Sequence, residues 1–189
     1  MKHLRYWYWQ KVFSKNQIIE LNNFIVNNYD NIEDKEKGAK YDDGTYKKNT
    51  VVKEIIYKKL KSFSYLEDAL QKAFLVSAYE YGIQNNPINF YDTLLLNCYS
   101  EKVNAKYDWH IDIAPQNSNY KINLTLLMNL SMNNYEGGKF MIFDGGEINI
   151  KEFDIPGSMI MFPSHINHKV TQVTKGERRS LTYFLSGVR

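Results

Sequence analysis

The sequence predicts an α+β domain in which two N-terminal helices precede about eight short strands, arranged as a double sheet or a barrel. Both stretches with apolar residues at helical spacing lie before Pro87. After Pro87 the chain consists of short apolar or alternating runs, which are typical of strands. Eight strands suit a jelly roll, so we expect the helices to pack on one outer face of its sheets.

The N-terminal region supplies the predicted helices and two short strands. Residues 4–12 are rich in aromatic side chains and predict a strand. Ser14 is suited to cap a helix, which we expect to end near Asn28. A second strand is predicted over 51–56, and an apolar stripe over 65–81 predicts the second helix.

Residues 30–50 contain many charged and small polar side chains and few that could build a core. We interpret this segment as a mobile surface loop. Its length of about 20 residues exceeds that of most connections, and loops this long are often functional. Two alternatives stay open: a lid over a pocket, or a plain surface excursion.

The second half of the chain predicts eight strands, some of them with one unusually polar face. In the last strand, Arg178, Ser180, Thr182 and Phe184 share a face, because successive strand residues point to opposite sides. Polar groups inside a barrel cost free energy unless they are paired, so such a face implies a bound polar ligand or ordered water. The eight predicted ranges are 89–99, 106–113, 121–130, 139–143, 147–153, 158–162, 168–173 and 178–185.

Composition and charge indicate one folded domain covering residues 1–189. We expect a helical support over about 1–85 and a strand-rich core over about 88–187. The 24 basic and 21 acidic side chains give a net charge of only +3 and are spread along the chain. Neither nucleic acid nor an anionic membrane is therefore an expected partner.

The single cysteine, Cys98, cannot form an internal disulfide and lies in an apolar run, so we expect a buried, unreactive thiol. The N-terminus lacks the apolar segment of a signal peptide, and no apolar run approaches the ~20 residues of a membrane span. A soluble, cytoplasmic protein is the expectation. These observations leave the oligomeric state undetermined.

The most informative motif is His110-Ile111-Asp112, followed far downstream by His168. On a strand, His110 and Asp112 would point to the same side and offer a nitrogen and an oxygen to one ion, with His168 arriving from another strand. Two histidines and one carboxylate are the ligand set of non-heme Fe(II) oxygenases. His165 would face the opposite side from His168, so we expect a surface or supporting role for it.

These residues belong to a longer set of motifs that resembles the 2-oxoglutarate- and Fe(II)-dependent dioxygenases of the prolyl 4-hydroxylase type. The resemblance covers most of the chain. Besides the three candidate ligands, it is carried by the strand ending in Tyr99, the Thr-x-Leu-Met-x-Leu strand that starts at Thr125, Tyr135-Glu136-Gly137-Gly138, Phe162-Pro163-Ser164, His168-Lys169-Val170 and Gly176-Glu177-Arg178.

The resemblance implies a double-stranded β-helix, a jelly-roll variant, with iron held by His110, Asp112 and His168. It further implies that Arg178, ten residues after the second histidine, pairs with the distal carboxylate of 2-oxoglutarate, assisted by the hydroxyls of Tyr99 and Thr125. A guanidinium suits that task, since it offers a planar fork and stays charged. The implied cofactors are Fe(II), 2-oxoglutarate as co-substrate and O2, with ascorbate as an accessory candidate.

Arg179 is a rival to Arg178, because a tight turn at Lys175-Gly176 would place Arg179 on the same face as His168. We prefer Arg178, since its spacing matches the family and its strand face is the polar one. Gly137-Gly138 and Gly145-Gly146 are interpreted as turn or bulge residues that bring backbones close. Trp109 is expected to point away from the metal.

The resemblance implies hydroxylation of a C–H bond with release of succinate and CO2, and the family precedent for the substrate is a prolyl residue in a peptide or protein. A free amino acid or another small molecule is the alternative, because a fold does not fix the substrate. Two further hypotheses are a nucleic-acid demethylase, disfavoured by the charge, and a non-catalytic β-helix binding protein, disfavoured by the intact motif.

Overall fold

The computed structural model describes residues 5–29, 47–83 and 93–188. Its two α-helices are α1 (Lys15–Asn28) and α2 (Ser64–Tyr79). The strands are β1 (Trp7–Trp9), β2 (Val51–Ile56), β3 (Thr93–Ser100), β4 (Tyr107–His110), β5 (Tyr120–Asn129), β6 (Glu136–Gly137), β7 (Phe140–Phe143), β8 (Glu147–Asn149), β9 (Met159–Pro163), β10 (His168–Val170), β11 (Val173–Lys175) and β12 (Glu177–Val188).

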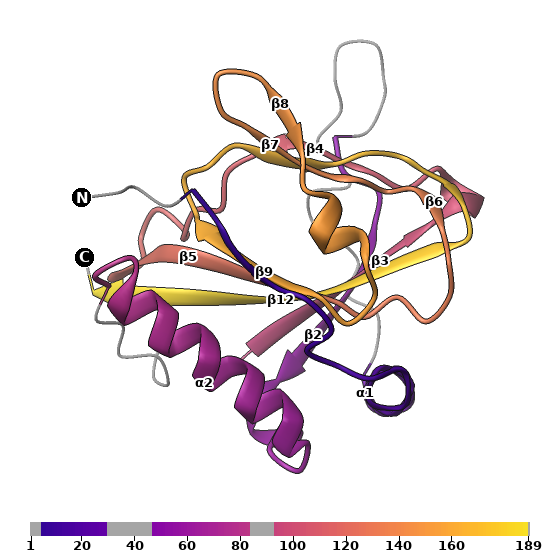
Figure 1. Ribbon diagram of the computed structural model, residues 1–189, viewed down its shortest axis with the longest axis horizontal. Coiled ribbons are helices and arrows are strands. Elements are labelled where there is room, and N and C mark those ends of the chain that lie inside the picture. The colour runs from indigo at the N-terminus through magenta and orange to yellow at the C-terminus, as the bar shows by residue number, and fades with distance from the viewer. Residues whose placement is uncertain (1–4, 30–46, 84–92, 189) are drawn as a thin grey trace.

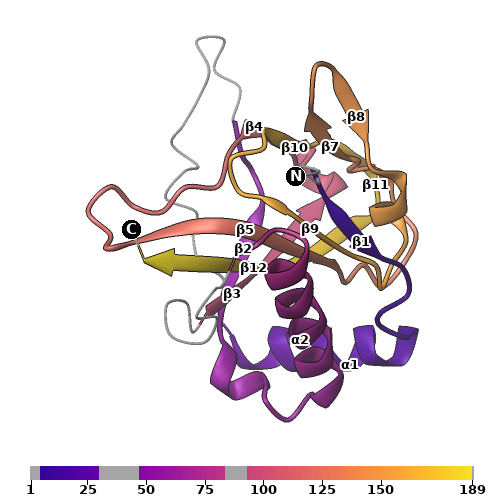
Figure 2. The same ribbon diagram turned by 60° about the vertical axis from the view of Figure 1, so that its left-hand side comes forward.

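Two antiparallel sheets form the body of the protein. The larger has the strand order β1-β9-β5-β12-β3-β2 and the smaller the order β4-β10-β7-β8, while β11 and β6 form a separate pair. Figures 1 and 2 show the larger sheet as the middle layer, with β4, β7 and β8 on one side and both helices on the other. This is the jelly-roll arrangement, with helices on one outer face, that the strand pattern predicts.

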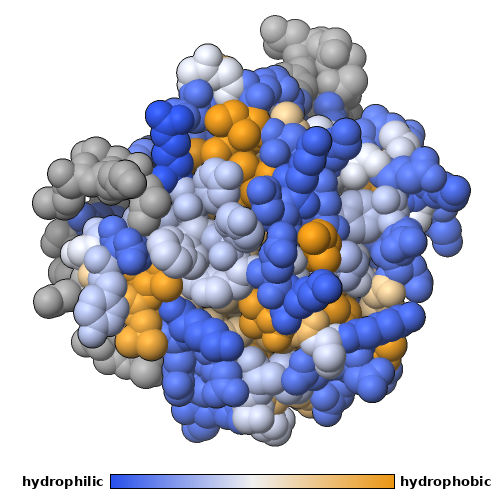
Figure 3. All heavy atoms as spheres, in the orientation of Figure 1, coloured by the Kyte–Doolittle hydropathy of each residue, from blue (hydrophilic) through white to orange (hydrophobic). Residues whose placement is uncertain are grey.

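Each face of the larger sheet has its own core. On the helix side, Leu21 and Ile25 of α1 and Leu66 and Leu70 of α2 pack with Leu126 and other fully buried strand residues. On the other side, a second cluster fills the space between the sheets and includes Leu127, Phe140, Phe153 and Phe162. The face seen in Figure 3 is mostly hydrophilic, with apolar side chains showing only in separate small patches.

The start of α1 follows from local sequence. Ser14 caps it with a complete capping box: the Gln17 amide donates to the Ser14 hydroxyl, and the Ser14 amide donates to the Gln17 side chain. The predicted end near Asn28 and the strand over 51–56 are also confirmed. Neither described helix has the length and apolar character needed to cross a lipid bilayer.

Several predicted strands are shorter than their sequence pattern. The first covers only Trp7–Trp9, and the run 147–153 is a strand only to Asn149, since Lys151–Asp154 form a 3-10 helix. That helix turns Phe153 into the inter-sheet core against Phe140, at 5.5 Å between ring centroids. Periodicity alone could not detect this turn, because an apolar residue at such a position suits either conformation.

The predicted strand 168–173 is divided between β10 and β11, which pair with different partners. Gly137, at φ 71°, approaches the second piece so closely that an added Cβ would lie 2.1 Å from the Gln172 carbonyl oxygen. The predicted role of the Gly137-Gly138 pair in close backbone approach is thereby confirmed.

Most of the predicted loop over 30–50 lies outside the described part of the chain, namely residues 30–46. Within its described end, Lys48 forms a β-bridge with Tyr107 of β4.

Candidate metal and co-substrate site

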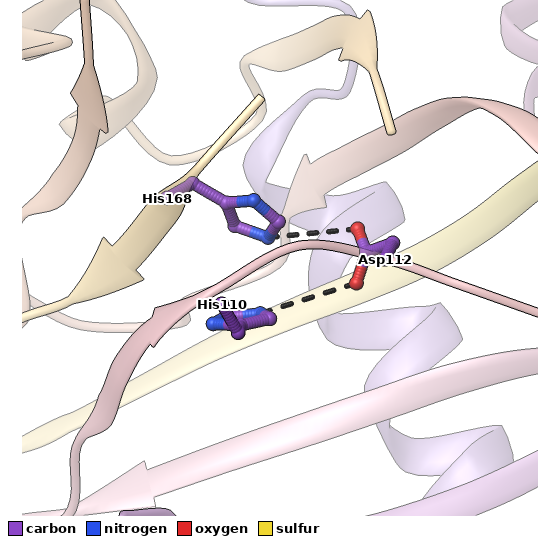
Figure 4. A group of neighbouring side chains, drawn as sticks. All are labelled: His110, Asp112 and His168. Atoms are coloured by element: carbon purple, nitrogen blue, oxygen red, sulfur yellow. Dashed lines mark ion pairs between the residues drawn. The ribbon is translucent and has the colours of Figure 1, made fainter. Parts of the chain in front are cut away.

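Three candidate metal ligands meet between the two sheets (Figure 4). His110 ends β4 and is paired directly with His168 of β10, which places the two ring centroids 4.1 Å apart. Asp112 lies beyond the end of β4, so its predicted position on the strand is wrong. Its carboxylate still reaches both rings, with Oδ1 3.9 Å from His110 Nε2 and Oδ2 3.5 Å from His168 Nε2. One donor atom from each residue lies within 4.8 Å of the others.

Backbone carbonyls orient both imidazoles toward this centre. Nδ1 of His110 is 2.7 Å from the Asp108 oxygen, and Nδ1 of His168 is 2.9 Å from the Ile166 oxygen. A carbonyl can only accept, so Nδ1 is the donor in each ring, and Nε2 is the nitrogen that faces the Asp112 carboxylate. Burial, followed by the neighbouring His168, lowers the pKa of His110 to about 2, and His110 is therefore neutral. Two imidazoles and one carboxylate fit an Fe(II) ion chemically.

The three ligands lie on the wall of a cavity of about 490 Å³. The inner face of the larger sheet contributes Tyr99, Ser180 and Thr182 to the same cavity. The polar face predicted for the last strand therefore does border a space for a ligand. Leu127, Phe140 and Val170 add apolar walls.

Arg178 is almost fully buried, with 1% of its surface exposed, and it contacts two residues of the cavity wall, Tyr99 and Ser180. Strand pairing sets it opposite Tyr99, and its guanidinium lies 5.1 Å from the Tyr99 ring centre and 5.4 Å from that of Phe153. Nη1 donates to the Ser180 hydroxyl at 3.1 Å, whereas Nε and Nη2 have no hydrogen-bond partner among the described residues. A buried cation with two free donors fits a bound carboxylate such as the distal one of 2-oxoglutarate.

Arg179 points the opposite way. Its Nε pairs with Glu177, and its Nη1 donates at 3.0 Å to the Asn22 side chain of α1. Because β12 is regular at Arg178 and Arg179, the two side chains lie on opposite faces of the strand, and Arg179 does not face the cavity side as Arg178 does.

His165 is exposed, as expected for a surface role. Trp109 packs against Phe143 and Lys169 and is not part of the cavity wall, in agreement with the prediction that it points away from the metal.

Of the two hydroxyl residues expected to assist Arg178, Tyr99 lies beside it and Thr125 does not. Thr125 is paired with Phe184, six positions along β12 from Arg178, and its hydroxyl donates to Asp112 Oδ2 at 2.6 Å.

Cys98, the lone thiol, is only partly buried, although burial is the main cause that raises its pKa to about 11. At that pKa the thiol is protonated and unreactive near neutral pH, as predicted.

Gly138 lies against the Arg178 side chain, at a position where the sequence indicated only a turn or bulge. Its φ is +56°, and an added Cβ would lie 3.0 Å from Arg178 Cδ and 2.9 Å from Val173 Cγ2. We expect Gly138→Ala to push the Arg178 stem aside and to weaken 2-oxoglutarate binding about tenfold or more, in addition to the backbone strain of about 1–2 kcal/mol. Isothermal titration with 2-oxoglutarate at saturating Mn(II) measures the first effect and thermal unfolding the second.

Gly145→Ala is the matched control for that substitution. Gly145 has a similar φ of +69°, but nothing lies within 4 Å of its added Cβ. It should show the loss of stability without any change in 2-oxoglutarate affinity. Equal affinities in the two variants would mean that Gly138 does not position Arg178.

Known proteins share both the motifs and the fold. Residues 94–186 match the family model described as the 2OG-Fe(II) oxygenase superfamily. A PKHD-type hydroxylase from Synechococcus sp. is 42% identical over 74 residues, which are 38% of this chain and 32% of that protein. Another from Nitrosomonas eutropha is 31% identical over 137 residues, 65% of this chain and 59% of that protein. The chain thus spans less than two thirds of the length of either relative.

A solved structure confirms the predicted double-stranded β-helix. The viral collagen prolyl hydroxylase of Paramecium Bursaria Chlorella virus-1, determined in complex with 2-oxoglutarate, superposes with a TM-score of 0.71 over 98% of each chain. At 14% identity this likeness concerns the fold.

Proposed function

We propose that this chain hydroxylates a prolyl residue in a peptide or protein, releasing succinate and CO2, on the premise that residues 94–186 match the 2OG-Fe(II) oxygenase superfamily and that its relatives include PKHD-type hydroxylases. The observation that carries the proposal is the convergence of His110, Asp112 and His168, with donor atoms within 4.8 Å, on one cavity. Behind its wall lies Arg178, whose Nε and Nη2 have no hydrogen-bond partner among the described residues.

Each group has a defined task in this proposal. His110, Asp112 and His168 hold the metal on one face, and the carbonyls behind the two imidazoles fix their orientation. Arg178 binds the distal carboxylate of the co-substrate, supported by Ser180 and the Tyr99 ring. Once bound, iron and 2-oxoglutarate supply the oxidising chemistry that converts a C–H bond to an alcohol. The apolar walls exclude water from the reacting centre.

A peptide substrate is supported by the rim of the cavity. Ile111 and Ile113 flank Asp112, line the cavity and remain 44% and 71% exposed. Exposed apolar side chains on both sides of a metal ligand suit a pyrrolidine ring carried by a larger molecule.

The test is a coupled assay with a library of proline-containing peptides, together with matched peptides in which alanine replaces proline. We expect succinate formation above the substrate-free rate and a mass gain of one oxygen on proline alone. Succinate stimulated only by free amino acids would support the small-molecule alternative instead. Wild-type protein that binds neither Mn(II) nor 2-oxoglutarate would refute the oxygenase proposal itself.

A further inference from the structure

The hydroxyl of Thr125 is placed to act on a metal ligand. Thr125 lies in the middle of β5, is fully buried, and donates to Asp112 Oδ2 at 2.6 Å. The same oxygen lies 3.5 Å from His168 Nε2, so the hydrogen bond is made at the point where the ligands converge.

Asp112 needs such a partner, because it belongs to no strand. It follows β4 by two residues, and its backbone is tied to the fold by its amide, which donates to the Ser164 oxygen at 2.9 Å. That bond fixes the main chain but leaves the carboxylate free to rotate. The Thr125 hydroxyl donates a hydrogen bond to this carboxylate, whereas the Nε2 atoms of His110 and His168 lie farther from it, at 3.9 and 3.5 Å.

The strand register separates Thr125 from the end of the site where Arg178 lies. Thr125 is opposite Phe184 on β12 and Phe162 on β9, whereas Arg178 is opposite Tyr99. Six residues of strand correspond to about 20 Å along the chain. This distance argues against the family-derived expectation that Thr125 shares the distal carboxylate of 2-oxoglutarate with Arg178.

We propose that Thr125 is a positioning residue for the metal centre: its hydroxyl holds the Asp112 carboxylate in the orientation that binds the metal. The inference rests on the proposed function only in requiring that His110, Asp112 and His168 bind a divalent metal. A partner that orients a metal ligand in this way is typically worth about 10–100-fold in metal affinity.

The test compares Mn(II) affinity, without 2-oxoglutarate, among variants at this position. Thr125→Val keeps the branched shape and removes the hydroxyl, and Thr125→Ser keeps the hydroxyl. We expect the valine variant to raise the Mn(II) dissociation constant about 10–100-fold, and the serine variant to stay within about threefold of wild type. Electron paramagnetic resonance of free Mn(II) gives these constants directly.

Thr182→Val is the matched control. Thr182 lies on the same inner face, one strand away, and its hydroxyl accepts from Asn97 at 3.1 Å rather than touching a metal ligand. Removal of the Thr182 hydroxyl should leave the Mn(II) dissociation constant unchanged. Thr125→Ala is a second variant without the hydroxyl, for use if valine prevents folding as judged by circular dichroism.

Two results would overturn the inference. One is an unchanged Mn(II) constant in the hydroxyl-free variants; the other is a normal Mn(II) constant with a raised 2-oxoglutarate constant at saturating metal, which would assign Thr125 to the co-substrate. Both are distinguishable from failure of the proposed function, since that failure would appear as absence of Mn(II) binding by the wild type.

Discussion

Replacing His168 with alanine is expected to abolish the weak visible charge-transfer band that develops when metal-free protein is titrated anaerobically with Fe(II) and 2-oxoglutarate. His168 is 4% exposed and supplies one of three donor atoms, so its removal leaves two ligands and a cavity. The loss should exceed the about 10–100-fold typical of changes that only reorient a ligand. The band and the Fe(II) dissociation constant are the measurements.

His165→Ala is the natural control, because His165 belongs to the same short segment but is exposed. Its band should match that of wild type. A band that survives in His168→Ala and disappears in His165→Ala would show that the wrong histidine has been assigned. Absence of the band from all three proteins at saturating iron and co-substrate would favour a non-catalytic β-helix.

Arg178→Met is expected to weaken 2-oxoglutarate binding at least about 100-fold while leaving metal affinity unchanged. A buried charge pair that loses one partner typically costs about 3–5 kcal/mol, and each 1.4 kcal/mol is tenfold. The 2-oxoglutarate affinity of Arg178→Lys should fall between those of wild type and Arg178→Met, since an ammonium keeps the charge but loses the planar fork. Titration with 2-oxoglutarate at saturating Mn(II) separates this effect from metal binding.

Arg178→Met is not expected to lower the stability of the protein, although it weakens 2-oxoglutarate binding. In the metal-free protein, methionine replaces a buried cation whose Nε and Nη2 have no partner in the described part of the chain, so the free energy of unfolding should be unchanged or higher. Arg179→Met should lower it by about 1 kcal/mol, through loss of the bond to Asn22, without affecting 2-oxoglutarate. If Arg179→Met instead weakened 2-oxoglutarate binding and Arg178→Met only lowered the free energy of unfolding, Arg179 would be identified as the carboxylate ligand.

Much of the architecture could be predicted from local sequence. The helix cap at Ser14, the apolar stripes of both helices and the alternation along β12 depend on residues a few positions apart, and the structure confirms them. The chemical types at the candidate site were equally visible, because histidine is rare in this chain and three of its four copies fall in two short segments.

Other features depended on contacts between distant segments. Periodicity suits both a strand and a 3-10 turn at Phe153, and only its packing against Phe140 decides between them. Likewise, spacing could not show that Asp112 lies beyond its strand.

The sequence by itself therefore determined the order of the elements, the apolar and polar faces, and the residues able to bind a metal and a carboxylate. The tertiary structure decided which of these residues meet. The register between β5 and β12 placed Thr125 beside Asp112 and away from Arg178, and Gly138 packed beneath the Arg178 stem. The physical reason is that periodicity and capping arise from neighbouring residues, whereas strand register is set by packing across the whole sheet.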